Sequence, residues 1–201
     1  MPDAMPTSTR SARTSFRLLV VVLGFLLITL VHDYLGQDAD WRPYRSEAAG
    51  FRVEVAGPVR ERTLDEEIDG VRVTSHYVSF SRDEVEYAVA RVDLPPQLAQ
   101  GQPAAALLAL AQGALVRRLG GRATAQRDTT VAGQPASAFQ VEARDGSVLA
   151  VRSLMAGRRL YTLMAASSSS GEPDIPGPGH FFASFALLGS GGTGGDAAGI
   201  R

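Results

Sequence analysis

The architecture can be worked out from one stretch, EVEYAVARVDLPP at residues 84–96. Apolar and polar residues alternate along it, as they do in a β-strand whose successive side chains point to opposite faces. The residues that share one face are Val85, Tyr87, Val89 and Arg91. The two prolines that follow lack a backbone N–H and cannot continue a sheet ladder. The stretch therefore predicts a strand that ends abruptly before another kind of element.

That element is PAAALLALAQGALVRRLGG, residues 103–121. It is dominated by helix formers, it opens on a proline that suits the first helical position, and it closes on a glycine pair that suits a C-terminal cap. The apolar residues that fall on one side, at spacings of three and four, are Leu108, Ala111, Leu115 and Leu119. Gly113 inside the helix is expected at a close packing contact, since glycine there costs about 1 kcal/mol relative to alanine.

Strand-like runs bounded by turn residues lie on both sides of this helix. They cover residues 51–55, 59–67 and 71–80 before it, and 123–131, 136–143, 148–156 and 159–166 after it. Short links such as Asp69-Gly70 and Asp145-Gly146 join antiparallel neighbours. The final run, HFFASFALL at 180–188, predicts a short helix in which Phe181 and Phe185 pack onto the sheet.

This order of elements predicts an α+β domain over residues 42–188. Its mostly antiparallel sheet has about seven strands, flanked by the central helix and the short C-terminal helix. Residues 36–41 are expected to be a tether and the glycine-rich residues 189–201 a flexible tail.

An uncharged apolar run, LLVVVLGFLLITLV at residues 18–31, precedes the domain. As a helix it covers roughly 21 Å, short of a hydrocarbon core of about 30 Å. Extension to residues 18–35, with Arg17 snorkelling at one interface and Tyr34 and Trp41 at the other, makes it long enough to span. We expect a transmembrane signal-anchor. The alternative is a cleaved secretory signal, although HDYLGQDADW after the run offers no A-x-A-like site.

Charge predicts the orientation of this anchor. Residues 1–17 carry Arg10, Arg13 and Arg17 against Asp3 alone, and the positive side of a membrane segment stays in the cytoplasm. Residues 1–17 are thus expected to be a cytoplasmic stub of a single-pass protein of the bacterial cytoplasmic membrane. The domain is then periplasmic or otherwise extracytoplasmic, or secreted if the signal is cut.

Composition limits the chemistry. The chain has no cysteine, which excludes disulfides, thiol nucleophiles and thiolate metal ligands. All twenty basic residues are arginine, yet they are dispersed among acidic residues and the net charge is −1, so we expect no nucleic-acid partner. Neither a Walker loop nor a Gly-x-Gly-x-x-Gly in strand–helix context occurs, since GSGGTG at 189–194 follows the last predicted helix.

Four sequence patterns resemble small extracytoplasmic bacterial domains with the PsbP-like fold, an antiparallel sheet sandwiched by helices. They are YRSEAAGFRVEVAGPV from residue 44, YAVARVDLPP from 87, VAGQPASAFQVEA from 131, and RRLYTLMA from 158 leading to FFASF. The resemblance spans most of residues 44–188. Its motifs are structural, so it implies a fold and a role in binding or assembly, with no catalytic residue to transfer.

His76, between Ser75 and Tyr77, is a candidate base for a Ser/His/acid site, although no Gly-x-Ser-x-Gly elbow is present. Of the other two histidines, His32 adjoins the apolar run and His180 opens the last predicted helix. A histidine on a sheet surface is the simpler interpretation of His76.

Three groups of charged residues also have both a functional and a simpler structural interpretation. The acidic run Asp65, Glu66, Glu67 and Asp69 could hold calcium, but a solvated hairpin tip explains it more simply. The pairs Arg117-Arg118 and Arg158-Arg159 could meet anionic lipid, while the first already complements a helix dipole. We therefore assign no catalytic, cofactor-binding or metal-binding residue and no cofactor.

The expected function is non-enzymatic binding or assembly of an envelope component by a membrane-anchored domain. The expected partners are the lipid bilayer, through the N-terminal helix, and an envelope protein. Two alternatives stay open: a carrier of a small apolar ligand held between helix 104–119 and the sheet, and an unrecognised hydrolase that uses His76.

Overall fold

The computed structural model describes residues 40–68, 71–144, 146–167 and 178–189. The predicted cytoplasmic stub at 1–17, the anchor at 18–35 and nearly all of the tail at 189–201 lie outside these residues. Among the described residues, no helix is long and apolar enough to cross a membrane.

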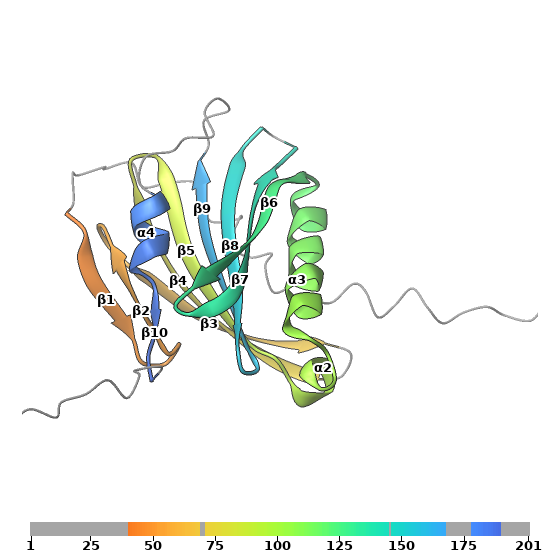
Figure 1. The fold of residues 1–201 in the computed structure, drawn as a ribbon. Helices are drawn as coiled ribbons and strands as arrows, with labels where there is room; N and C mark the ends of the chain where they lie inside the picture. The colour runs from red at the N-terminus through yellow and green to blue at the C-terminus, as the bar shows by residue number, and fades with distance from the viewer. Residues whose placement is uncertain (1–39, 69–70, 145, 168–177, 190–201) are drawn as a thin grey trace, which may run out of the picture.

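A seven-stranded sheet in which every neighbouring pair is antiparallel forms the centre of the domain (Figure 1). The α+β class and the large antiparallel sheet predicted from the sequence are thus confirmed. Across the sheet the strands are β3 (Arg60–Ile68), β4 (Val71–Arg82), β5 (Val85–Asp93), β9 (Arg159–Ser167), β8 (Val148–Ala156), β7 (Gln134–Glu142) and β6 (Arg122–Val131).

A second, three-stranded sheet comprises β1 (Arg42–Ser46), β2 (Phe51–Val55) and β10 (Ala186–Leu187). It corrects the helix predicted over 180–188, because the helix there, α4 (Pro178–Ser184), stops early. Ala186 then pairs with Arg52, and the Leu188 amide donates to the Gly50 carbonyl at 2.9 Å. The short strand exists because β2 offers it a partner, which local periodicity does not reveal.

The central helix has the predicted extent. After a single turn, α2 (Pro96–Ala99), helix α3 runs over Ala104–Leu119. Pro103 stands at the N-cap, one position before the first helical residue, and Gly120 ends the helix in the left-handed conformation with φ 58°. A side chain at Gly113 would meet only the flexible Arg117 side chain of the same helix, so the expected close contact with another element is not found.

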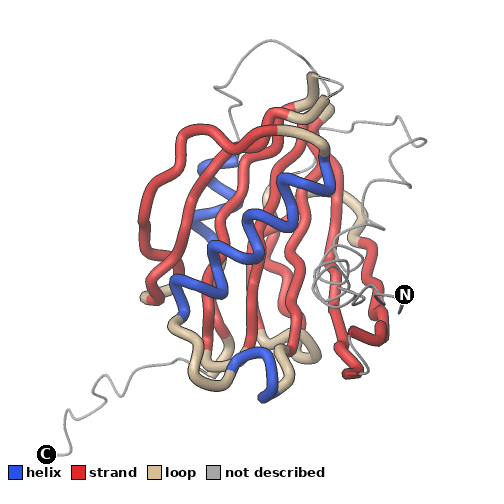
Figure 2. The backbone as a smooth tube through the Cα atoms, turned by 90° about the vertical axis from the view of Figure 1, so that its right-hand side faces the viewer, coloured by secondary structure: helices blue, strands red, loops and turns tan. Residues whose placement is uncertain are grey.

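Both faces of the large sheet are covered, which explains why β5 has buried residues on both sides. Val85, Tyr87 and Val89 belong to one apolar cluster and share their face with Arg91, as predicted, while Ala88, Ala90 and Val92 belong to the other. Helix α3 crosses one face diagonally (Figure 2) and contacts β6, β7 and β8. The small sheet and α4 cover the opposite face (Figure 1).

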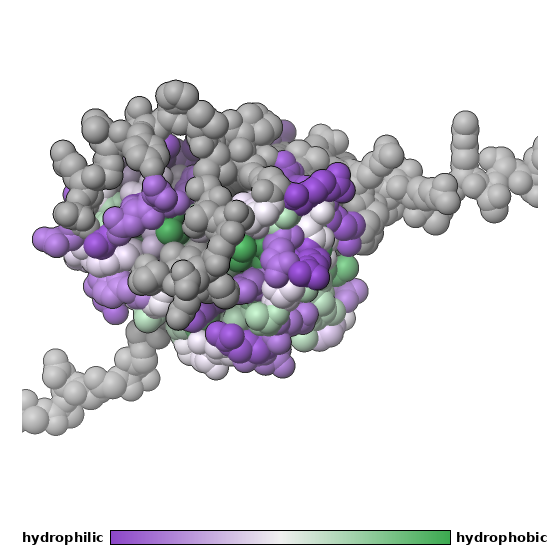
Figure 3. Space-filling view, turned by 90° about the horizontal axis from the view of Figure 1, so that it is seen from above, coloured by the Kyte–Doolittle hydropathy of each residue, from purple (hydrophilic) through white to green (hydrophobic). Residues whose placement is uncertain are grey.

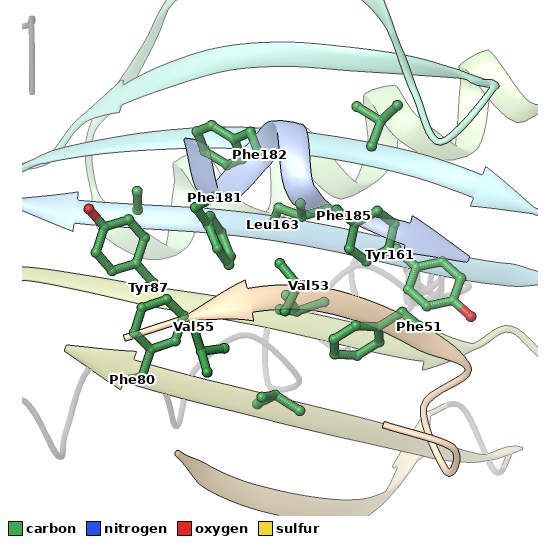
Figure 4. Close-up of a cluster of buried hydrophobic side chains, with 14 of the residues drawn as sticks. Phe51, Val53, Val55, Phe80, Tyr87, Tyr161, Leu163, Phe181, Phe182 and Phe185 are labelled. Atoms are coloured by element: carbon green, nitrogen blue, oxygen red, sulfur yellow. The ribbon is translucent and has the colours of Figure 1, made fainter. Parts of the chain in front are cut away.

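Aromatic rings fill the layer under the small sheet and α4 (Figure 4). Phe80 and Tyr87 stack with their centroids 4.9 Å apart, and Phe181 meets Tyr87 edge-on at 5.2 Å. The predicted packing of Phe181 and Phe185 onto the sheet is confirmed, since both are almost fully buried among these rings. The apolar residues under α3 are mainly aliphatic by contrast.

Candidate functional site

His76 lies in the middle of β4, and its ring does not meet the hydroxyl of its sequence neighbour. The Nδ1 atom of His76 is 3.0 Å from the Thr63 hydroxyl on β3. Ser75 faces the other side of the sheet, fully buried, and its hydroxyl has no hydrogen-bond partner among the described residues. Adjacent residues of a strand point to opposite faces, so Ser75 and His76 cannot act as nucleophile and base for one another.

The acidic run falls at the far end of β3. Asp65 is exposed and accepts a hydrogen bond of 2.6 Å from the Thr74 hydroxyl on β4. Glu66 and Glu67 pair through β3 with Val73 and Arg72, and Asp69 lies outside the described residues. Within the part of the chain that the structure describes, no group of three histidine, aspartate or glutamate side chains could hold a metal ion.

The two arginine pairs occupy different settings. Arg117 and Arg118 lie in the last turn of α3, where they complement the helix dipole. Arg158 is exposed at the turn between β8 and β9, while the Arg159 Nε atom lies 3.5 Å from an Asp93 carboxylate oxygen. In the second pair, Arg158 therefore faces solvent and Arg159 forms a surface ion pair.

A buried ionic cluster that the sequence did not single out fixes the turn between β1 and β2. Arg91, only 7% exposed, binds the Asp93 carboxylate through Nε at 3.2 Å and Nη2 at 2.7 Å, and its Nη1 donates to the Ala48 carbonyl. The Tyr161 hydroxyl donates to the Ala49 carbonyl at 3.0 Å. Because these donors satisfy carbonyls of a turn, the cluster's role is structural.

A second unforeseen cluster closes the end of the aromatic layer. The Trp41 ring lies 4.7 Å from the His180 ring, and the Arg82 guanidinium carbon is 5.1 Å from the Trp41 centroid. His180, on α4, binds the Glu54 carboxylate of β2 through Nε2. These contacts tie the start of the domain to its last helix.

The pKa of the Tyr44 hydroxyl on β1 is strongly shifted by its surroundings. Burial, together with the nearby Glu61 carboxylate, raises the pKa of the Tyr44 hydroxyl to about 12. The hydroxyl faces this carboxylate without meeting the geometry of a hydrogen bond and has no other partner among the described residues. At neutral pH the phenol stays protonated, so the group offers no nucleophile or base.

The outward side of α3 is the most unusual surface. At 100° per residue, Ala106, Ala109, Leu110 and Gly113 share the side opposite the buried Leu108, Ala111 and Leu115, and the Arg117 side chain lies over Gly113 at the end of this side. We call these four apolar residues the outer α3 face. Leu110 is 48% exposed and is the one exposed large apolar side chain among the described residues. The first charge of the helix is Arg117.

The face seen from above is largely polar where it is visible. There, hydrophilic residues occupy much of the surface of the described residues, with smaller apolar areas between them (Figure 3). Both edge strands of the large sheet carry charges, with the sequence RERTLDEEI in β3 and RATAQRDTTV in β6. Charged edges discourage strand-to-strand association, so they are poor candidates for a binding surface.

Comparison with known proteins bears on the fold. No family model matches the chain, and no curated protein matches it. A solved structure, the cyanobacterial PsbP (CyanoP) of Synechocystis sp. PCC 6803, superposes with a TM-score of 0.51 over 79% of this chain and 98% of that one. The fold is PsbP-like. The two sequences are 11% identical, so the likeness concerns architecture alone.

Three of the sequence motifs that suggested the resemblance fall within strands, turns and helices of this fold. YRSEAAGFRVEVAGPV covers β1, β2 and the turn that Arg91 and Tyr161 hold. VAGQPASAFQVEA covers the β6–β7 turn and β7, and FFASF covers the end of α4. The resemblance expected from the sequence is therefore confirmed for the fold.

Proposed function

We propose that this chain is a membrane-anchored extracytoplasmic domain that binds, without catalysis, a protein component of the cell envelope. The partner contacts the outer α3 face. The resemblance to PsbP-like domains, a fold that serves binding and assembly, agrees with this proposal.

The observation that carries the proposal is the apolar character of the outer α3 face. A helix that packs one side on a sheet normally turns charged or polar residues to water. Here the helix has no charge over residues 104–116, and its outward residues are alanine, leucine and glycine. Exposed apolar patches of this kind mark contact surfaces, and small side chains let a partner approach the backbone closely.

The anchor rests on the sequence. The uncharged run at 18–31, with arginines before it, supports insertion with the domain on the outer side. Tethering keeps the domain near the bilayer and raises its effective concentration toward other membrane components. A weak contact through α3 then suffices for assembly.

The two alternatives gain no support from the fold. A carrier would need space between α3 and the sheet, where Leu108 and Leu115 instead belong to one buried cluster with Phe139 and Val151. A hydrolase would need an acid that orients His76 beside its nucleophile, whereas the exposed His76 ring meets the Thr63 hydroxyl and binds no carboxylate among the described residues. The carrier would therefore require α3 to move away from the sheet residues against which it packs.

Site-specific photo-crosslinking in the native cells tests the contact. A photoreactive amino acid at position 110 is compared with one at 128, where exposed Asp128 lies on edge strand β6. We expect a discrete adduct of one size from position 110 and none from position 128. The same adduct pattern from both positions would contradict a contact through α3.

Protease accessibility tests the topology independently. Protease added to intact spheroplasts should digest the domain, because the proposal places it outside the cytoplasmic membrane. Protection until lysis would reverse the orientation and remove the envelope role, whatever the crosslinking result.

A further inference from the structure

Two arginines face one another across an alanine on the sheet face that α4 covers. In the strand register Arg127 of β6 lies opposite Ala138 of β7, and Ala138 lies opposite Arg152 of β8. Residues opposite one another share a face, and neighbouring strands are about 4.8 Å apart, so the two arginine backbones are separated by about 10 Å. Ala138 is buried and its side chain is a single methyl group, so no large side chain stands between the two arginines.

The guanidinium of Arg152 is held in place. Its central carbon lies 4.7 Å from the centroid of the Phe182 ring, which α4 brings down onto β8. Arg152 is half-buried, while Arg127 at the sheet edge is exposed. Burial, together with the positive charge of Arg127, lowers the pKa of Arg152. The two positive groups therefore act on one another.

Neither arginine has an acidic partner within 4.0 Å among the described residues. The nearest acidic residue on the same side of β7 is Glu142, which already binds Arg122 at 2.6 Å. In the row of paired residues that runs across the sheet from Arg152 toward β3, three apolar residues come first, and the next charged residue is Glu61. Water screens the exposed Arg127 charge, yet the two like charges still repel one another, and a bound anion would remove that repulsion.

Two neutral polar residues lie next to the arginine pair on the same face of the sheet. Thr129 follows Arg127 on the same side of β6, and Gln140 follows Ala138 on the same side of β7. Both are half-buried. Hydroxyl and amide groups of this kind complete the coordination of an oxyanion whose charge is met by arginine forks.

We propose that the guanidinium groups of Arg127 and Arg152, on neighbouring sides of Ala138, together bind a phosphate group at the accessible end of the pair. A phosphate monoester carries about −1.5 to −2 charges near pH 7, which matches two guanidinium groups, and arginine binds phosphate oxygens in a bidentate manner. The site lies on the face opposite α3. It is therefore independent of the contact proposed for the outer α3 face.

Calorimetric titration of the full chain with inorganic phosphate, in neutral detergent, tests the site. The wild type should show saturable binding, which Arg127→Gln and Arg152→Gln each weaken by about tenfold or more, because each loses one charge-assisted bidentate contact. Arg158→Gln, on the exposed β8–β9 turn, is the matched control and should bind as the wild type does. Absence of saturable binding, or equal affinities in all four proteins, would overturn the proposal.

A charge reversal guards against misfolding as an explanation. Arg127→Glu places a carboxylate where it can pair with Arg152, so phosphate binding should disappear while the melting temperature rises or stays unchanged. Retained binding in this variant would also overturn the proposal.

The source of the phosphate is distinguished in nanodiscs. Phosphatidic acid added to phosphatidylcholine discs should lower the apparent affinity for inorganic phosphate if the natural ligand is a lipid headgroup. An unchanged affinity would identify a soluble phosphate compound. Both results support a phosphate site. The Arg127 and Arg152 variants decide whether that site is the one formed by these two arginines.

Discussion

The two faces of the central sheet are covered in different ways. Under the small sheet and α4, rings from both sides interlock, and Arg91 and Tyr161 hold the β1–β2 turn through its carbonyls. Under α3 the contact is aliphatic, made by a single helix across β6, β7 and β8. The first face is closed by several elements distant in sequence, whereas the second is closed by one helix whose other side remains apolar.

Under the function proposed above, this difference separates the buried layers from the contact surface. Interlocked aromatic rings and the turn hydrogen bonds of Arg91 and Tyr161 join the elements on the α4 side. The helix on the other side buries one stripe and presents the outer α3 face to solvent. Substitutions in either buried layer should therefore act on folding, and substitutions on the outer α3 face should act on binding.

The largest expected effect is that of Phe181→Ala. Phe181 is fully buried and contacts the rings of Phe80, Tyr87 and Phe182, so its removal should cost about 3–5 kcal/mol of unfolding free energy. Urea denaturation of the full chain in neutral detergent measures it. A loss below about 1 kcal/mol would mean that α4 is not part of the core.

Leu115→Ala tests the opposite face by the same denaturation. The side chain is 4% exposed under α3, and its loss should cost about 3 kcal/mol. If Leu115→Ala proved much more damaging than Phe181→Ala, the ranking of the two faces would be reversed.

Tyr161→Phe removes one hydroxyl from the anchored turn and keeps the ring. Loss of the hydrogen bond to the Ala49 carbonyl should cost about 1 kcal/mol. Tyr44→Phe is the matched control, because the buried Tyr44 hydroxyl has no hydrogen-bond partner among the described residues, and it should be neutral or stabilising. Equal losses in both variants would contradict a specific role for the turn anchor.

Glu86→Gln should have the smallest effect and a distinct pH dependence. Burial raises the pKa of Glu86, an effect that Arg60 partly offsets. The folded state is therefore favoured by this group below the ordinary glutamate pKa, and that stability is lost as pH rises through the raised value. At neutral pH the glutamine variant should melt at a higher temperature than the wild type. If the two proteins had equal melting temperatures at pH 4 and also at pH 8, the raised pKa of Glu86 would be contradicted.

Parts of this architecture could be predicted because they depend on local periodicity. The alternation in β5 and the spacing in α3 are complete within one segment, and so is the glycine that ends α3. β1 was missed because RPYRS is polar and mostly exposed. β10 was missed because two residues become a strand only when β2 pairs with them.

The sites divide in the same way. The uncharged side of α3 can be read from residues 104–116 alone. The Arg127–Arg152 pair cannot, since it depends on strand order and on the register shift between Thr124 and Arg127. The Arg91 anchor depends on a turn more than forty residues away in sequence. The sequence identifies His76 as a candidate base because of its side chain, but only the strand structure shows that Ser75 faces away from it.

The central claim is that the outer α3 face binds a partner and contributes little to folding. Leu110→Glu tests it most directly, with Asp128→Arg on exposed β6 as its control, by co-purification from solubilised native membranes and by urea denaturation. We expect Leu110→Glu to change the free energy of unfolding by less than about 0.5 kcal/mol, as is usual at an exposed site, and to lose a stoichiometric partner that the control retains. Recovery of the same partner in the same ratio with Leu110→Glu would contradict the account.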